Sequence, residues 1–169
     1  MIRDEIENAT HLYRKYRAPI LKDPIIAPLI NRYKEILEKS SLVMEELGIS
    51  AACASCAGRN TSGCCFSGVE EWYDCYILLI NLLLNAELPV KADFADSCLF
   101  VGEKGCKLKA RHSFCVNFMC PDLQKSLAPA GSHVLLNTIG MELQTGWELE
   151  RYLRDWISRE VKGVQSILK

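Results

Sequence analysis

Nine cysteines in a chain of 169 residues, against only three histidines, constrain this sequence more than any other feature. Eight of them fall in two stretches rich in small and turn-forming residues, and the ninth, Cys75, lies between the stretches in an apolar segment. The first stretch holds Cys53, Cys56, Cys64 and Cys65, and the second holds Cys98, Cys106, Cys115 and Cys120. Such polar, glycine-containing stretches do not build a core, so we expect a chemical role for these eight thiols. For Cys75 we expect a buried thiol that only packs.

The N-terminus argues against a disulfide framework. Residues 1–7 are charged and lack the apolar segment of a secretory signal. We therefore expect a cytoplasmic protein, and in a reducing compartment clustered cysteines bind metal or take part in catalysis. An odd number of cysteines would also leave one thiol over in a fully paired framework.

The spacing of the cysteines is typical of metal ligands. Cys53 and Cys56 form a Cys-x-x-Cys pair, in which one tight turn aims two thiolates at the same ion. Cys64 and Cys65 are adjacent, and because neighbouring side chains diverge, they serve either two centres or one centre with the other thiol packed away. We predict that the thiols of both stretches converge as metal ligands. Thiolate ligation fits zinc and iron–sulfur clusters alike, so both cofactors stay open here.

Composition and charge describe an ordinary single domain spanning residues 1–169. Hydrophobic residues make up 49% of the chain, and the net charge of −1 removes the electrostatic case for a nucleic-acid partner. The longest apolar run, Tyr76 to Leu84, contains Asn81 and falls short of the roughly 20 residues of a membrane span. We expect no nucleic acid and no membrane as partner, and a protein or small-molecule partner stays open.

Hydrophobic periodicity predicts a mainly α fold, in which helices frame a small irregular Cys-rich region over about residues 51–120. Residues 1–50 are expected to be helical, with a break where Asp23 precedes Pro24 and caps the next helix. Residues 132–168 carry a helical apolar stripe in which Gly140 and Gly146 weaken the case for one unbroken helix. Residues 99–109 predict at most a short β-hairpin.

A further helix is expected from Val69 to about Leu88, between the two Cys-rich stretches. Ser67 and Glu70 fit a capping box at its start, and Pro89 ends it. The helix is apolar on almost all sides, so we expect it to be central and to bury Cys75.

Other candidate residues carry less weight. Trp72, Trp147 and Trp156 fall on apolar helical faces and are expected in the core. His112 lies between two cysteines of the second stretch and is an alternative ligand or a donor to a thiolate. The chain has no glycine-rich nucleotide loop and no serine nucleophile motif, so enzymatic activity stays uncertain.

The second half of the Cys-rich region adds Leu99-Phe100 after Cys98, Gly105 before Cys106, and Arg111 before Cys115. Together with Cys53-x-x-Cys56 and the adjacent pair, this pattern over about residues 53–120 resembles the YkgJ-type cysteine-cluster family. That family is described as zinc- or iron-chelating. The cysteine region is also similar to that of flagellin lysine N-methylases, a group associated with an iron–sulfur cluster and S-adenosylmethionine. The resemblance implies a metal centre and ranks iron–sulfur slightly above zinc.

Three classes of function follow. The first is an iron–sulfur or zinc centre that supports redox or group-transfer chemistry. The second is a structural zinc site in a helical interaction module, and the third is a thiol-based metal carrier or sensor.

Overall fold

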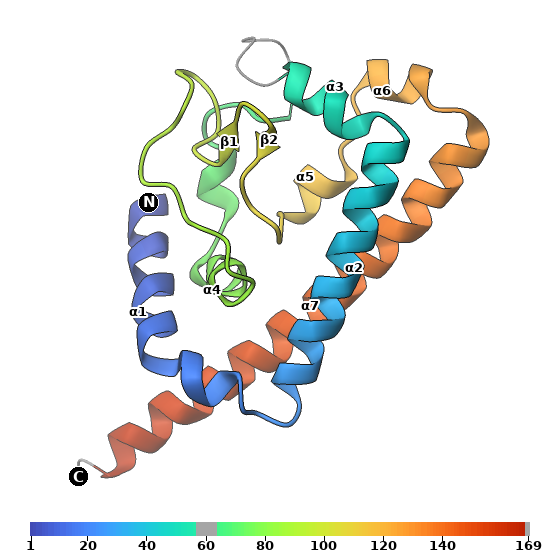
Figure 1. The fold of residues 1–169 in the computed structure, drawn as a ribbon. Helices are drawn as coiled ribbons and strands as arrows, with labels where there is room; N and C mark the ends of the chain where they lie inside the picture. The colour runs from blue at the N-terminus through green and yellow to red at the C-terminus, as the bar shows by residue number, and fades with distance from the viewer. Residues whose placement is uncertain (57–63, 168–169) are drawn as a thin grey trace.

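Helices dominate the molecule, as the periodicity predicts. The computed structural model describes residues 1–56 and 64–167. Three long helices frame it: α1 (Ile2–Ile20), α2 (Ile26–Glu46) and α7 (Pro129–Ile167), with α2 running alongside α7 (Figure 1). Shorter elements lie between α1 and the α2–α7 pair and, for α3 and α6, at one end of that pair (Figure 1). These are α3 (Ile49–Cys56), the 3₁₀ helix η1 (Val69–Trp72), α4 (Cys75–Leu83), β1 (Val101–Gly102), β2 (Gly105–Cys106), α5 (Ser113–Asn117) and α6 (Pro121–Ser126).

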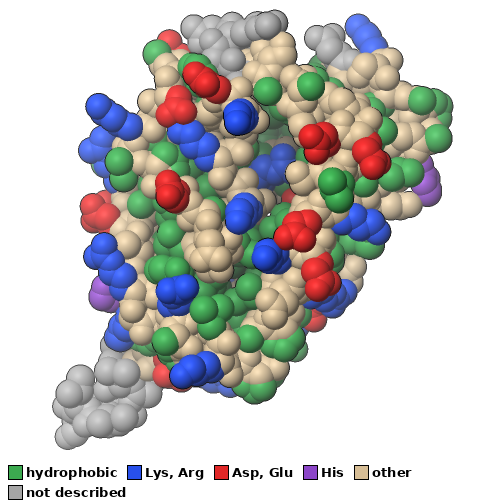
Figure 2. Space-filling view, in the orientation of Figure 1, with side chains coloured by type: hydrophobic (Ala, Val, Ile, Leu, Met, Phe, Trp, Pro, Cys, Tyr) green, Lys and Arg blue, Asp and Glu red, His purple; other side chains and the backbone are tan. Residues whose placement is uncertain are grey.

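The surface carries charges of both signs. Figure 2 shows acidic and basic side chains mixed across one face of the molecule. Among the described residues, the structure contains no helix with the length and apolar character needed to cross a bilayer.

The break between α1 and α2 is confirmed. Asp23 Oδ1 accepts hydrogen bonds from the N–H groups of Ile25 and Ile26 at 2.9 Å each, which satisfies two donors at the start of α2. These bonds also hold the pKa of the Asp23 carboxyl below its usual value. At the other end of α2, Gly48 adopts a φ of +72°, the left-handed conformation expected after a helix, and α3 follows.

The helix expected from Val69 to Leu88 is wrong in its bounds. Residues 69–72 form η1, and α4 begins only at Cys75 and ends at Leu83. Asp74 is the N-cap of α4, because its extended backbone lets Oδ1 accept from the N–H groups of Tyr76 at 2.9 Å and Ile77 at 3.1 Å.

The expected capping box at this helix is also absent. Glu70 Oε2 accepts from the Gly68 N–H at 2.9 Å, so the carboxylate closes the start of η1 and does not reach back to Ser67. Cys75 is therefore the first residue of α4 and is half-buried against the core, where we expected it inside a longer helix.

The C-terminal segment forms one unbroken helix of 39 residues, so neither glycine interrupts it. Gly146 has a packing role: a Cβ at this position would lie 2.9 Å from the Tyr33 hydroxyl and 3.0 Å from its Cζ. The missing side chain therefore lets the Tyr33 ring of α2 lie directly on the backbone of α7. A Cβ at Gly140 would meet no neighbouring atom within 4 Å, so this position has no such constraint.

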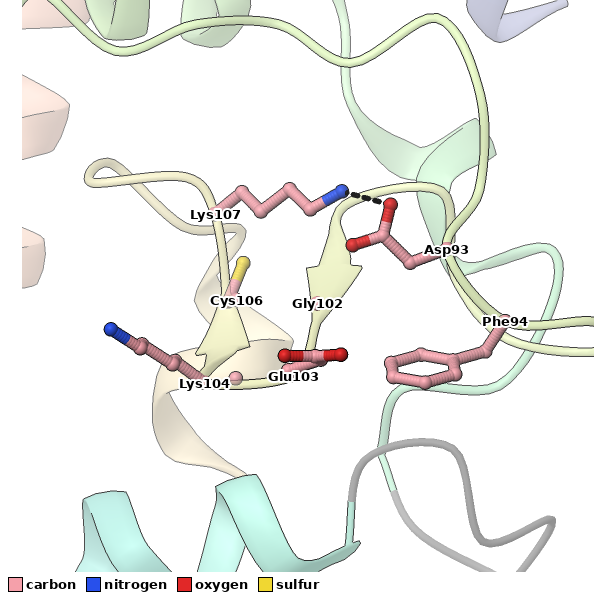
Figure 3. Close-up of a pocket in the computed structure, with 8 residues that line it drawn as sticks. Asp93, Phe94, Gly102, Glu103, Lys104, Cys106 and Lys107 are labelled. Carbon is pink, nitrogen blue, oxygen red and sulfur yellow. Dashed lines mark ion pairs between the residues drawn. The ribbon is translucent and has the colours of Figure 1, made fainter.

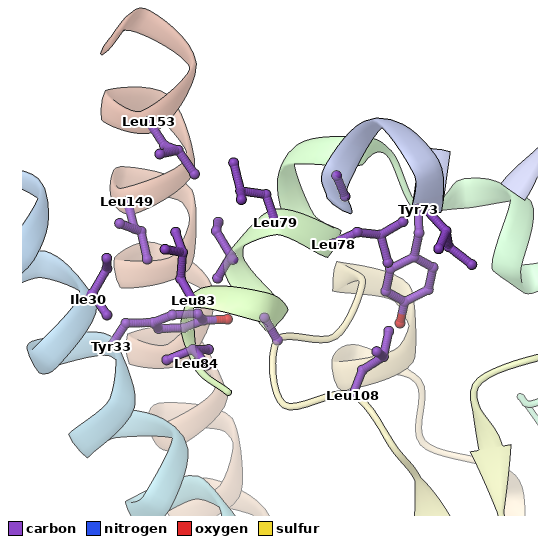
Figure 4. Close-up of a cluster of buried hydrophobic side chains, with 14 of the residues drawn as sticks. Ile30, Tyr33, Tyr73, Leu78, Leu79, Leu83, Leu84, Leu108, Leu149 and Leu153 are labelled. Atoms are coloured by element: carbon purple, nitrogen blue, oxygen red, sulfur yellow. The ribbon is translucent and has the colours of Figure 1, made fainter. Parts of the chain in front are cut away.

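Two hydrophobic clusters form the interior. The main core joins α1, α2, α4 and α7 and includes Tyr73 and Phe100 from the Cys-rich region (Figure 4). The second core lies at the other end of α2 and consists of Met44, Ile49, Val116, Leu135 and Ile139. The Cys-rich region therefore lies between two packed clusters.

The expectation for the tryptophans is only partly correct. Trp156 packs on the main core and makes an edge-to-face contact with Tyr16, at 5.8 Å between ring centroids. Trp147 is 64% exposed and Trp72 is 44% exposed. Trp72 is the last residue of η1 and lies outside the core. Its ring makes edge-to-face contacts with Phe66 and Phe114.

Candidate metal centre

The Cys-x-x-Cys pair lies on a helix. Cys53 and Cys56 belong to the last turn of α3, where a spacing of three residues places both side chains on one face. Both residues are exposed, although the atoms around the Cys53 sulfur are dense enough that burial is the main cause of its raised pKa. The irregular Cys-rich region that we expected over about residues 51–120 begins with a helix instead, and residues 57–63 lie outside the described residues.

The two Cys-rich stretches lie side by side. The Cys98 N–H donates to the Cys65 carbonyl at 2.9 Å, and Phe66 pairs with Ser97 in an antiparallel bridge. The predicted hairpin is present, with Val101 opposite Cys106 in the β1–β2 pair. Backbone pairing therefore connects the first stretch to the hairpin of the second.

The adjacent cysteines lie close together and diverge less than expected. Their Sγ atoms are 4.0 Å apart, and both side chains are half-buried. A hydrogen bond from the Cys65 thiol lowers the pKa of Cys64, and the same bond raises the pKa of Cys65. The two sulfurs therefore titrate as a coupled pair.

Tyr73 contacts the second stretch directly. Its hydroxyl donates to Cys115 Sγ at 3.7 Å and accepts from the His112 N–H at 2.9 Å. The side chain is buried, and burial raises the pKa of its hydroxyl well above the usual value, so the proton stays in place. We did not single out Tyr73 from the sequence, since a tyrosine in an apolar segment gives no signal for such a contact.

His112 has a structural role in this arrangement. It precedes α5, and its Nδ1 accepts from the Phe114 N–H at 3.2 Å, so one ring nitrogen caps the helix that carries Cys115. Its ring also contacts Trp72 and Tyr73, at 5.7 and 5.9 Å between centroids.

Asn81 ties α4 to the segment before α5. It is fully buried, and its Oδ1 accepts from the N–H groups of Lys109 and Ala110 at 2.8 and 3.0 Å. Its Nδ2 donates to the carbonyls of Ala110 at 2.8 Å and Ile77 at 2.9 Å. A single polar residue in an apolar run was the signal that could have predicted such an anchor.

Arg111 brings a positive charge to the thiols. Its guanidinium lies 4.0 Å from Glu142 and 3.3 Å from Met44 Sδ. Glu142 is 1% exposed, and among the described residues neither of its carboxylate oxygens has a hydrogen-bond partner. Arg111 therefore compensates the charge of Glu142. The same guanidinium lowers the pKa of thiols in both stretches.

Most of the cluster thiols are protonated at neutral pH. Burial raises the pKa of Cys98 to about 12 and also raises the pKa of Cys53, Cys106 and Cys115. Arg111 offsets part of this rise at Cys53, Cys106 and Cys115. Mutual repulsion between the sulfurs adds to the rise, so a second positive charge among them would favour the thiolates.

Cys75 lies apart from this cluster. Its N–H donates to Glu5 Oε2 at 2.7 Å, and the charged groups that act on it are Glu5, Asp74 and Arg154. Burial raises the pKa of the Cys75 thiol to about 11, as expected for a thiol that only packs.

An open cavity of about 410 Å³ lies at the hairpin. Cys106 lines it beside the Lys107–Asp93 ion pair, which spans 2.7 Å (Figure 3). Cys106 has an exposed surface toward this cavity, yet the atoms around its sulfur are dense enough that burial is the main cause of its raised pKa. One thiol of the cluster is therefore reachable from solvent here.

The donor set fits a thiophilic metal by its chemistry. All nine cysteines are among the described residues, and no disulfide joins any of them. Within residues 1–56 and 64–167, no three Cys, His, Asp or Glu side chains are set to hold an ion as they stand. A metal centre here would therefore require the thiols to rotate toward it, which would couple metal binding to local folding.

Comparison of the chain with protein-family models, with curated proteins and with solved structures finds no match in any of the three. The site must be interpreted from its own residues.

Proposed function

We propose that this protein binds a zinc or iron–sulfur centre through the thiolates of its Cys-rich region. The observation that carries the proposal is the separation of the nine cysteines: eight lie in two stretches paired to each other, and the ninth lies elsewhere with acidic neighbours. Random placement of small apolar residues does not separate thiols in this way. Ligation by thiolates requires several cysteines to lie near one another.

The electrostatics around the thiols support a cationic occupant. Several buried thiols repel one another as thiolates, and Arg111 supplies one positive charge that is shared with Glu142. A divalent ion or an iron cluster would supply the missing charge. Tyr73 would then donate a hydrogen bond to a metal-bound sulfur at Cys115, which is the kind of outer contact that tunes a thiolate centre.

Elemental analysis and an absorption spectrum of protein prepared without oxygen test this proposal. Iron, acid-labile sulfide and visible absorption would identify an iron–sulfur centre suited to redox or group-transfer chemistry. Zinc in a colourless protein would identify a structural centre, and zinc lost to a mild chelator would identify a carrier or sensor. Protein that contains no metal and takes up neither zinc nor iron would contradict the proposal.

A further inference from the structure

We propose that the eight thiols form two adjacent four-thiolate sites. Cys65, Cys98, Cys106 and Cys115 form the core-side site, and Cys53, Cys56, Cys64 and Cys120 form the helix-side site. The inference rests on the proposed function and adds the number of centres, their ligands and their exchange with solvent. A tetrahedral ion takes four thiolates, so eight thiols suffice for two ions.

The core-side thiols share one environment. Cys65, Cys98 and Cys115 pack against the main core, and the Cys98–Cys65 backbone hydrogen bond fixes the first two together. The hairpin brings Cys106 back toward Cys98, since Lys107 N–H donates to the Phe100 carbonyl at 2.8 Å. These thiols also interact electrostatically with one another: Cys98 with Cys106 and Cys115, and Cys65 with Cys98 and Cys106.

The helix-side thiols belong to the second core. Cys53 and Cys56 lie on α3, and Cys120 immediately precedes α6, two helices that lie near each other at one end of the molecule (Figure 1). Residues flanking these cysteines, Ile49 on α3 and Leu123 on α6, pack in the same cluster. Charge repulsion from three other thiols raises the pKa of Cys53, and Cys64 contributes most, followed by Cys56 and Cys120.

The adjacent pair joins the two sites. The Cys65 backbone is hydrogen-bonded to Cys98 of the second stretch. Negative charge on Cys64 raises the pKa of Cys53 on α3 and also the pKa of Cys106 and Cys115. Their Sγ separation of 4.0 Å places the two ligand sets in contact. Arg111 acts on two thiols of each set, so its charge serves both sites.

The two sites differ in access to solvent. Cys53 and Cys56 are exposed on a short helix, whereas Cys98 is 6% exposed and Cys115 is held by the Tyr73 hydrogen bond. Cys106 is the one exposed cysteine of the core-side set, against two exposed cysteines in the helix-side set. We therefore expect the helix-side site to exchange its metal with solvent faster than the core-side site. The helix-side site is thus the one that takes up or releases a thiophilic divalent cation.

Cobalt titration of the reduced, metal-free protein tests the inference, because Co²⁺ bound by four thiolates absorbs strongly in the visible. The wild-type chain is expected to bind two equivalents, and a chelator should then release them in a fast and a slow phase. Cys56→Ser should bind one equivalent and lose the fast phase. Cys98→Ser should bind one equivalent and lose the slow phase, and Cys75→Ser should retain both.

Each other outcome overturns the inference. One equivalent in the wild-type chain, or loss of both in Cys56→Ser, would mean a single shared site while leaving the proposed function intact. Absence of any cobalt binding would remove the proposed function as well. Cys56 is an exposed helical position, so the Cys56→Ser protein should fold. Its cobalt stoichiometry distinguishes two sites from one shared site even if the Cys98→Ser protein does not fold.

Discussion

At the scale of single residues, the contacts around the thiols matter as much as the thiols themselves. Tyr73 holds Cys115 and the backbone of His112 with one hydroxyl, and Asn81 holds the preceding segment with one amide. Both side chains are buried and make two or more hydrogen bonds, so neither can turn away without leaving partners unsatisfied. The position of Cys115 is therefore set by residues that do not themselves bind metal.

Tyr73→Phe should weaken metal binding without removing a ligand. It deletes the hydrogen bond to Cys115 Sγ and leaves the His112 N–H without its acceptor, at a cost of about 1–2 kcal/mol of stability. Loss of such an outer contact lowers metal affinity by about 10- to 100-fold. Tyr76→Phe is the matched control, because its ring lies under Arg154 next to Cys75. Equal zinc affinities for both variants in a competition titration would show that the Tyr73 contact is immaterial.

At the scale of elements, local sequence signals located a helix start or end where a single residue marks it. They failed where two residues were both suitable as the cap of one helix. Gly48 follows the end of α2 as expected, and the Asp23 carboxylate accepts from two N–H groups at the start of α2, although the N-cap residue is Ile25 and not Asp23. The start of α4 was misplaced because Ser67 and Asp74 are both good caps, and the turn of η1 between them is fixed by packing of Val69 and Tyr73 in the core.

Some features of the candidate site could be predicted from local sequence signals, and others could not. The eight cysteines and their two stretches could be identified from spacing alone. The helical setting of Cys53 and Cys56 could not, since the small residues around them suit turns and short helices equally. Contacts such as Tyr73 with Cys115, 42 residues apart in sequence, depend on tertiary packing that no local pattern encodes.

Substitution of Gly146 and Gly140, two of the four glycines of α7, tests how α2 docks on α7. Gly146→Ala places a Cβ 2.9–3.2 Å from three atoms of the buried Tyr33 side chain, and this crowding should destabilise the protein by about 1–3 kcal/mol. Gly140→Ala meets no atom within 4 Å and should stabilise by about 0.5–1 kcal/mol through helix propensity. Chemical denaturation of both variants checks the pair. Equal shifts for the two variants, or stabilisation by Gly146→Ala together with destabilisation by Gly140→Ala, would disprove this docking.

At the scale of the whole molecule, the Cys-rich region lies between two hydrophobic cores. The main core holds Cys65, Cys98 and Cys115 on one side, and the second core holds α3 and α6 on the other. Metal bound between them would add a connection to the helices α2 and α7, which contribute residues to both cores. Binding should therefore raise the melting temperature of the protein as one unit.

Metal affinity and metal-free stability should change with pH in opposite directions. The raised pKa values of Cys53, Cys98, Cys106 and Cys115 mean that metal binding releases protons, so affinity should rise from pH 6 to pH 8. In the metal-free protein, the protonated thiols stabilise the fold below the unfolded pKa of about 9. That stabilisation is lost as the pH rises through the folded values, about 12 for Cys98. Zinc titrations and denaturation curves across this range check both; an affinity independent of pH would contradict protonated ligands.

The metal content of three chains tests the central claim most directly. Wild-type protein, Cys75→Ala and Cys115→Ala are prepared alike without oxygen, and metal per chain is measured for each. We predict that Cys75→Ala keeps the wild-type metal content and loses about 1 kcal/mol of stability through packing alone, whereas Cys115→Ala loses metal. Loss of metal in Cys75→Ala together with full retention in Cys115→Ala would contradict metal binding by the two Cys-rich stretches.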